Sequence, residues 1–109
     1  MAETFKVLAQ GAPTANTLTD LYTVGSNTST SISSLTVCNR GATSTTFRVS
    51  VAPAGAADST IQYIFYDQVI DANSTFIATI GITLAATDKI RVYSGNTNLT
   101  FIAFGVEVN

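Results

Sequence analysis

The sequence of 109 residues contains no histidine and no tryptophan, only one cysteine, and few charged residues. Without histidine, the commonest general base near neutral pH is missing, and so are Ser-His and Cys-His nucleophile pairs and histidine metal ligands. A single cysteine excludes an internal disulfide and indicates a chain made in a reducing cytosol. The sequence therefore predicts a protein that is not an enzyme, with no catalytic residue, no cofactor and no metal site.

The one cysteine, Cys38, lies in the strand-like run "LTVCN". A reactive thiol needs an electropositive surrounding that lowers its pKa, and Arg40 is the only cation nearby. Free cysteine otherwise behaves as a small hydrophobic residue. We therefore interpret Cys38 as a structural residue.

Charged residues make up 11% of the chain, against roughly 25% in a typical soluble domain, and the net charge is −2. The five cations are scattered, which disfavours a nucleic-acid partner. No apolar run approaches the ~20 residues of a membrane-spanning helix, and no secretory signal is recognisable, so no membrane partner is expected. The scarcity of charge fits either a Thr- and Ser-rich β exterior or a surface covered in a larger assembly.

Three of the seven carboxylates, those of Asp58, Asp71 and Asp88, occur in turn-like segments, where Asp caps its own backbone. Asp67 and Asp71 are four residues apart, but no loop has the alternating acidic pattern of a calcium site. This spacing does not support a metal-site prediction.

Alternation with a period of two predicts strands along most of the chain. Around residue 49, Phe47, Val49 and Val51 alternate with Arg48 and Ser50, which predicts one buried and one wet face. The same pattern recurs in "DKIRVYS". Sandwich-like strands are therefore expected.

Other segments depart from simple alternation. "LTFIAFGVEV" at 99–108 is apolar on both faces, which predicts a strand covered by the core on one side and by a neighbour on the other. "STFIATIGI" at 74–82 reads as one strand, and a change of parity predicts a bulge near Ser33 and Ser34. The segment 84–88 could form one loose helical turn.

Turn-like segments separate about eight short strands at intervals of roughly 8 to 12 residues, as in a sandwich or small jelly roll. Asn39–Ala42 and Gly95–Asn96 are hairpin candidates. The predicted fold is all-β: a single domain over residues 1–109, an antiparallel β-sandwich with jelly-roll or immunoglobulin-like strand order. Residues 1–13 form an N-terminal arm or an edge strand.

Two groups of residues are candidates for partner contacts. Tyr63, Phe65 and Tyr66 place three aromatics within four positions of one strand, so they must point to both of its sides. Phe5 and Val7 share one side of the N-terminal segment, which could add a strand to the exposed edge of a partner. Core packing is the alternative role for these side chains.

The sequence from about Leu18 to the end resembles a group of small virion structural proteins of tailed bacteriophages. The best landmarks are "NRGA" at 39–42, "FRV" at 47–49, "GITLAATD" at 81–88 and "FGVE" at 104–107. These are hairpin and strand-edge features, not a catalytic signature. The resemblance implies a compact β-sandwich present in many copies on the particle.

From this resemblance we expect a virion protein, assembled in the cytoplasm of the host bacterium, that stabilises the head as a capsid decoration or cement subunit. It would contact other virion proteins, such as major capsid or tail subunits, as a homo-oligomer, trimer or dimer. A tail, baseplate or neck component is an alternative. Another is a module that binds host-surface carbohydrate, for which "SGNTN" with Tyr93 is the local candidate.

Overall fold

A computed structural model of the chain describes residues 2–109. Nearly all of the regular structure is β, with two short 3₁₀ turns, η1 (Pro53–Gly55) and η2 (Thr60–Gln62). The strands are β1 (Glu3–Gly11), β2 (Thr19–Thr23), β3 (Ser29–Asn39), β4 (Thr45–Ala52), β5 (Tyr63–Ile70), β6 (Thr75–Ala78), β7 (Ile82–Leu84), β8 (Lys89–Ser94) and β9 (Leu99–Val108). The all-β prediction is confirmed.

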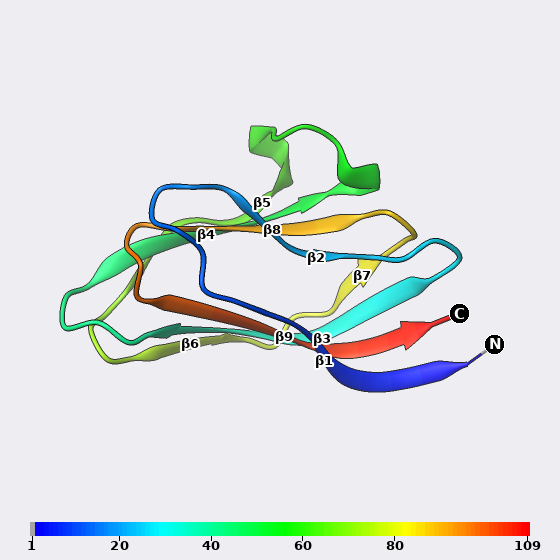
Figure 1. The fold of residues 1–109 in the computed structure, drawn as a ribbon, viewed down its shortest axis with the longest axis horizontal. Helices are drawn as coiled ribbons and strands as arrows, with labels where there is room; N and C mark the ends of the chain where they lie inside the picture. Colours follow the sequence, from blue (N-terminus) through cyan, green and yellow to red (C-terminus); the bar gives the residue numbers. More distant parts are fainter. Residues whose placement is uncertain (1) are drawn as a thin grey trace.

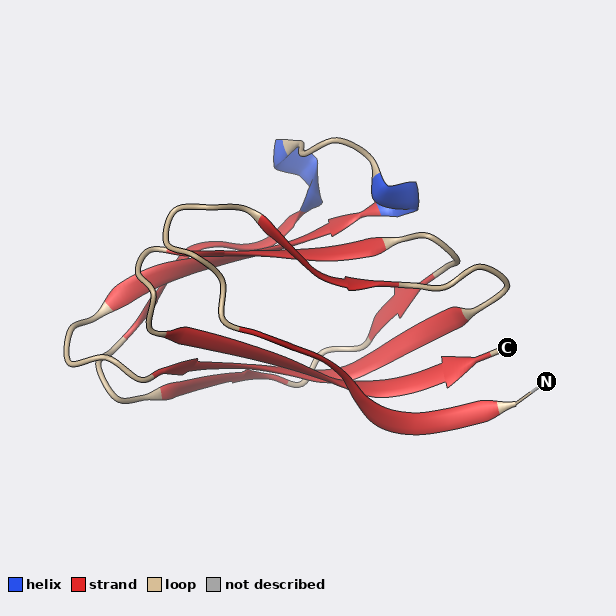
Figure 2. Ribbon diagram, in the orientation of Figure 1, coloured by secondary structure: helices blue, strands red, loops and turns tan. Residues whose placement is uncertain are grey.

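The strands form two antiparallel sheets that pack face to face (Figure 1). Sheet A has the order β1-β9-β3-β6, and β7 also pairs with β3. Sheet B has the order β2-β8-β4-β5. The connection from β4 to β5 carries both 3₁₀ turns and stands on the outer side of sheet B (Figure 2).

The strand order is that of a jelly roll. Most connections cross from one sheet to the other, and if β6 and β7 are counted as one interrupted strand, eight strands form two four-stranded sheets. Both predicted hairpins are wrong, because Asn39–Ala42 joins β3 of sheet A to β4 of sheet B, and Gly95–Asn96 joins β8 of sheet B to β9 of sheet A. Residues 3–11 are an edge strand, paired with β9.

The core lies between the sheets and is centred on aromatic rings. The ring of Phe47 lies 5.3 Å from that of Phe76, 6.0 Å from that of Phe65 and 6.1 Å from that of Phe101, measured between centroids. These separations suit tilted and edge-to-face packing. Because the four rings come from β4, β5, β6 and β9, the cluster joins both sheets.

The register of the strands tests the finer predictions. A bulge lies between Ile32 and Ser34 of β3, as expected. The segment 74–82 is interrupted between β6 and β7. In place of the helical turn expected at 84–88, Leu84 ends β7 and Ala85–Asp88 form a β-turn, with Thr87 at φ 68°. Ser50 is fully buried, against expectation. Its cross-strand neighbour Arg91 donates to the carbonyl oxygens of Gly55 and Ala56, which holds the β4–β5 connection over this part of sheet B.

Candidate interaction surfaces

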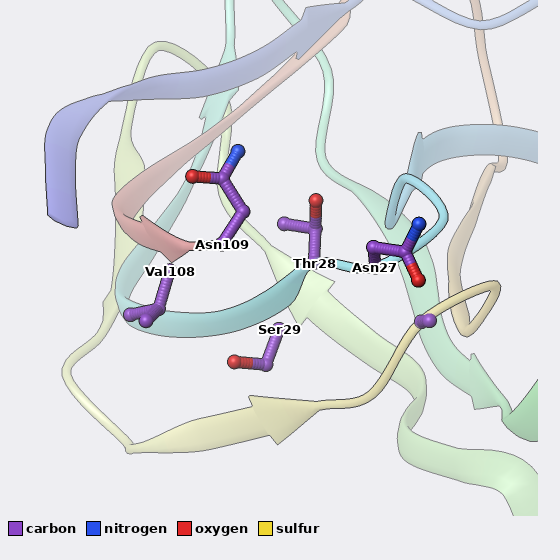
Figure 3. A pocket seen from close by; sticks show the side chains of 6 residues that line it. Asn27, Thr28, Ser29, Val108 and Asn109 are labelled. Carbon is purple, nitrogen blue, oxygen red and sulfur yellow. The ribbon is translucent and has the colours of Figure 1, made fainter. Parts of the chain in front are cut away.

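No three His, Cys, Asp or Glu side chains among residues 2–109 lie close enough to hold a metal ion. A hollow at the end of the sandwich near the termini is lined by amide, hydroxyl and apolar side chains, among them Asn27, Thr28 and Asn109 (Figure 3). Over the same residues, no helix is long and apolar enough to span a membrane.

The outer face of sheet A is rich in apolar side chains. Cross-strand pairs place one set of residues on this face, because their neighbours along each strand point into the core. The apolar members are Phe5, Val7, Ile77, Ile102, Phe104, Val106 and Val108. Phe5 is 78% exposed and Ile77 is 63% exposed. Isolated apolar residues are normal on a surface, but several on one face of one sheet indicate an interaction site.

Charged groups are confined to the two ends of this face. Glu3 lies at one end, and at the other end Arg40 donates from Nε to Thr100 Oγ1 at 2.9 Å. Between these ends, no described residue on the face is charged; the polar positions are Gln10, Ser29, Ser31, Ser34, Thr36, Thr75 and Thr83. Cys38 also lies here, paired across the strands with Thr75 and Thr100. We call this surface the uncharged face.

The shape of the uncharged face includes a shallow groove. Phe5, Ser31, Phe104 and Val106 line it, so the groove runs beside the edge strand β1. Lys6 also borders this groove, but its Nζ is 2.8 Å from Glu107 Oε1. Its charge is thereby paired with a carboxylate that also bonds to a residue of sheet B, across the sandwich.

The outer face of sheet B, in contrast to the uncharged face, carries several charged side chains. Asp20 accepts from Lys89 Nζ at 2.8 Å and from Arg91 Nε at 3.1 Å, and Arg48 Nε donates to Asp67 at 2.7 Å. The two cations lower the pKa of Asp20, with the hydrogen bond from Lys89 as the largest cause. The two faces of the sandwich therefore differ sharply in electrostatic character.

Arg48 is also held between two aromatic rings on sheet B. Its guanidinium carbon lies 4.2 Å from the centroid of Tyr66 and 4.4 Å from that of Tyr93. Asp67, its ion-pair partner, lies at a bulge of β5 with φ 52°. A stacked, paired guanidinium between tyrosines is a rigid arrangement, and Tyr and Arg are enriched at binding hot spots.

A second apolar surface follows β5 and the turn before it. Its members are Ile61, Ile64, Tyr66 and Val69, which we call the β5 flank. Ile61 on η2 is 92% exposed. A shallow groove beside it is lined by Val51, Pro53 and Tyr63. The β5 flank belongs to sheet B, so it lies apart from the uncharged face.

The structure places the five predicted contact residues in different settings. Phe5 and Val7 are exposed on the uncharged face, and Tyr66 is exposed on the β5 flank. Tyr63 is half-buried, and its ring packs edge-to-face against that of Tyr66, with 5.1 Å between the ring centroids. Phe65, in contrast, packs against the core cluster.

Sequence reasoning missed Ile61, Ile77 and Val69, which are also exposed. Ile77 had a usable signal, because it is the one large apolar residue at the polar positions of its strand, beside Thr75 and Thr79. Ile61 and Val69 had none, since their exposure depends on where the β4–β5 connection and the edge of sheet B lie.

One polar cluster joins the two sheets at the end of the sandwich. The Tyr22 hydroxyl, from β2, lies 2.5 Å from Glu107 Oε2 and 2.7 Å from Thr30 Oγ1. Burial and the bond to Glu107 raise the pKa of Tyr22 to about 12. Lys6 and then Tyr22 lower the pKa of Glu107.

We expect Tyr22→Phe to lower the free energy of unfolding by about 1–2 kcal/mol at pH 7, because a buried hydrogen-bonded hydroxyl is lost. The raised pKa of Tyr22 stabilises the folded state fully below the unfolded pKa, about 10, and the benefit is lost as the pH rises toward 12. The difference between wild type and variant, measured by urea unfolding, should therefore shrink between pH 10 and 12. A constant difference would contradict this assignment.

Glu107 acts in the opposite pH range. Its lowered pKa stabilises the folded state above the unfolded value, about 4.3, and this benefit is lost as the pH falls through the folded pKa. At neutral pH, Glu107→Gln should therefore have a lower free energy of unfolding than wild type. In the same unfolding series, this difference should disappear below about pH 4.

Comparisons of this chain with protein-family models, with curated proteins and with solved structures find no match.

Proposed function

We propose that this chain is a non-enzymatic structural protein of a tailed-bacteriophage particle, a decoration or cement subunit of the capsid that acts through protein–protein contacts. The observation that carries the proposal is the presence of two separate exposed apolar surfaces, the uncharged face and the β5 flank. A subunit of an assembly needs such surfaces for at least two neighbours. The sequence resemblance to small phage virion proteins supplies the kind of assembly.

The β5 flank suits attachment to a larger virion protein. Ile61 projects from the molecule and Tyr66 lies beside the stacked Arg48, so an apolar anchor adjoins an aromatic and cationic hot spot. Charged residues around an apolar centre resemble the polar rim of a protein interface. Attachment here would leave the opposite face of the sandwich available to another neighbour.

A tail, baseplate or neck component would use the same surfaces, so the alternatives differ in location and not in mechanism. Carbohydrate binding has less support in the loop after Tyr93. The ring of Tyr93 is stacked on Arg48, and its hydroxyl donates to Asn16. The Asn96 side chain accepts from the backbone N–H of Asn98, so these groups are engaged within the chain.

The test uses phage particles that lack this protein and the purified full chain added back to them. Wild-type protein should co-sediment with the particles and saturate, and a reconstruction of the decorated particle should place its density on the head. Ile61→Lys and Tyr66→Lys should weaken binding at least 10-fold, because each puts a charge into the apolar contact. Thr97→Lys, at an exposed position of the loop between β8 and β9, is the matched control and should bind normally.

Absence of binding at saturating protein concentration would overturn the proposal. Density on the tail or neck would move the subunit to the alternative location and would refute the decoration role. If Thr97→Lys weakened binding as much as Ile61→Lys, the effect would come from added charge in general, and the β5 flank would lose its assignment.

A further inference from the structure

We infer that the uncharged face is a self-association surface, on which two copies of this chain pack back to back about a two-fold axis. A second copy is then one of the neighbours that the proposed function requires, and in this respect the dimer rests on that function. The occupant is identified from the charge, the area and the symmetry of the face.

The charge pattern selects an uncharged partner. A charged side chain buried against this face would lose its hydration and find no counter-charge between Glu3 and Arg40. The outer face of sheet B is unsuitable for the same reason, since it carries Asp20, Arg48 and Arg91. The uncharged face of another copy matches, because between Glu3 and Arg40 it brings no charged side chain to the contact.

The area is sufficient for a stable pair. Four strands spaced about 4.8 Å apart, with a length of about 34 Å for a ten-residue strand, cover roughly 650 Å² per copy. Two copies therefore bury roughly 1,300 Å², within the range of specific interfaces, about 1,200–2,000 Å². Phe5 and Ile77 are more exposed than the half-buried Ile102, Phe104 and Val106, so a partner would cover the most apolar surface at these two side chains.

Two-fold symmetry makes the packing self-consistent. Phe5 lies on the edge strand β1, and Ile77 lies on the opposite edge strand β6. With the two-fold axis along the strands, the β1 edge of one copy faces the β6 edge of the other. Phe5 then lies over the row of Ser31 and Thr83 of the facing sheet, and Ile77 lies over the row of Gln10 and Ile102. Sheets packed in this way lie about 10 Å apart.

The test is sedimentation velocity on the full chain from 1 to 100 µM. Wild type should pass from a monomer of 11.4 kDa to a dimer. Phe5→Lys and Ile77→Lys should each weaken dimerisation at least 10-fold, since each buries an unpaired cation. Val69→Lys is the matched control, because Val69 is 59% exposed but lies on sheet B, and its dimer should be unchanged. Circular dichroism confirms that each variant is folded.

Cys38 gives a second readout on the same face. In the dimer its thiol is covered, so its reaction with a thiol reagent should be at least 10-fold slower at 100 µM than at 1 µM. In Ile77→Lys the rate should not depend on protein concentration. A protein that stays monomeric at 100 µM, a trimer, or a dimer disrupted by Val69→Lys alone would each overturn the inference.

These outcomes are separate from those of the proposed function. A monomer that binds particles through the uncharged face, with Ile77→Lys abolishing binding, would refute self-association and leave the structural role in place. A protein that forms the dimer but does not bind phage particles would establish the self-association surface and refute the virion role.

Discussion

Replacement of Gly105 by alanine is expected to lower the free energy of unfolding by about 3 kcal/mol, although it adds a single methyl group. Gly105 is in β9 and pairs with Ile32 at the bulge of β3. A Cβ atom on Gly105 would lie 2.1 Å from the Ser31 carbonyl oxygen and 3.0 Å from the Ile32 Cα. Both are backbone atoms of a central strand, so β3 and β9 must separate to accommodate the methyl group. Urea unfolding followed by fluorescence or circular dichroism measures the loss.

Gly81 provides the matched control for this substitution. It lies between β6 and β7, and a Cβ atom there would have no heavy atom within 4 Å. Gly81→Ala should leave stability unchanged or raise it by up to about 1 kcal/mol, because alanine restricts the unfolded chain. Equal losses in both variants would show that the close approach of β3 and β9 is not the cause.

Replacement of Asn39 by leucine is expected to cost about 3 kcal/mol, because several buried polar groups lose their partners together. Asn39 is 1% exposed at the end of β3. Its Nδ2 donates to the carbonyl oxygens of Thr43 at 2.9 Å, Asp71 at 3.2 Å and Ile70 at 3.4 Å. Its Oδ1 accepts from the Gly41 N–H at 2.9 Å. One side chain therefore fastens two connections that cross between the sheets.

Ser74→Ala is the control at the same junction. Its hydroxyl donates to the Asp71 carbonyl oxygen at 2.7 Å, but this bond is exposed to water. Its removal should cost no more than about 1 kcal/mol, since water replaces the lost donor. Chemical unfolding of both variants separates the buried network from an ordinary surface bond. If Asn39→Leu proved as mild as Ser74→Ala, the two crossings would not depend on the Asn39 side chain.

Local patterns predicted the strands well because alternation is set within each strand. Val49 and Ile90 are buried at the positions where a period of two placed them. The bulge before Ser34 was predicted for the same reason, since a change of parity is visible along the chain. Turn residues gave less information. "NRGA" predicts that the backbone changes direction. The same turn residues, however, occur in a hairpin within one sheet and in a connection that crosses from one sheet to the other.

By itself, the sequence determined that the chain is all-β, that its core is built from Phe, Val, Ile and Leu, and that no histidine is present. Only the tertiary structure decided the jelly-roll order and the contrast between an uncharged face on sheet A and a charged face on sheet B. The physical reason is that alternation assigns each side chain to one of two sides of its own strand. Which strands become neighbours, and which side of a sheet meets water, depends on pairing between residues far apart in the chain.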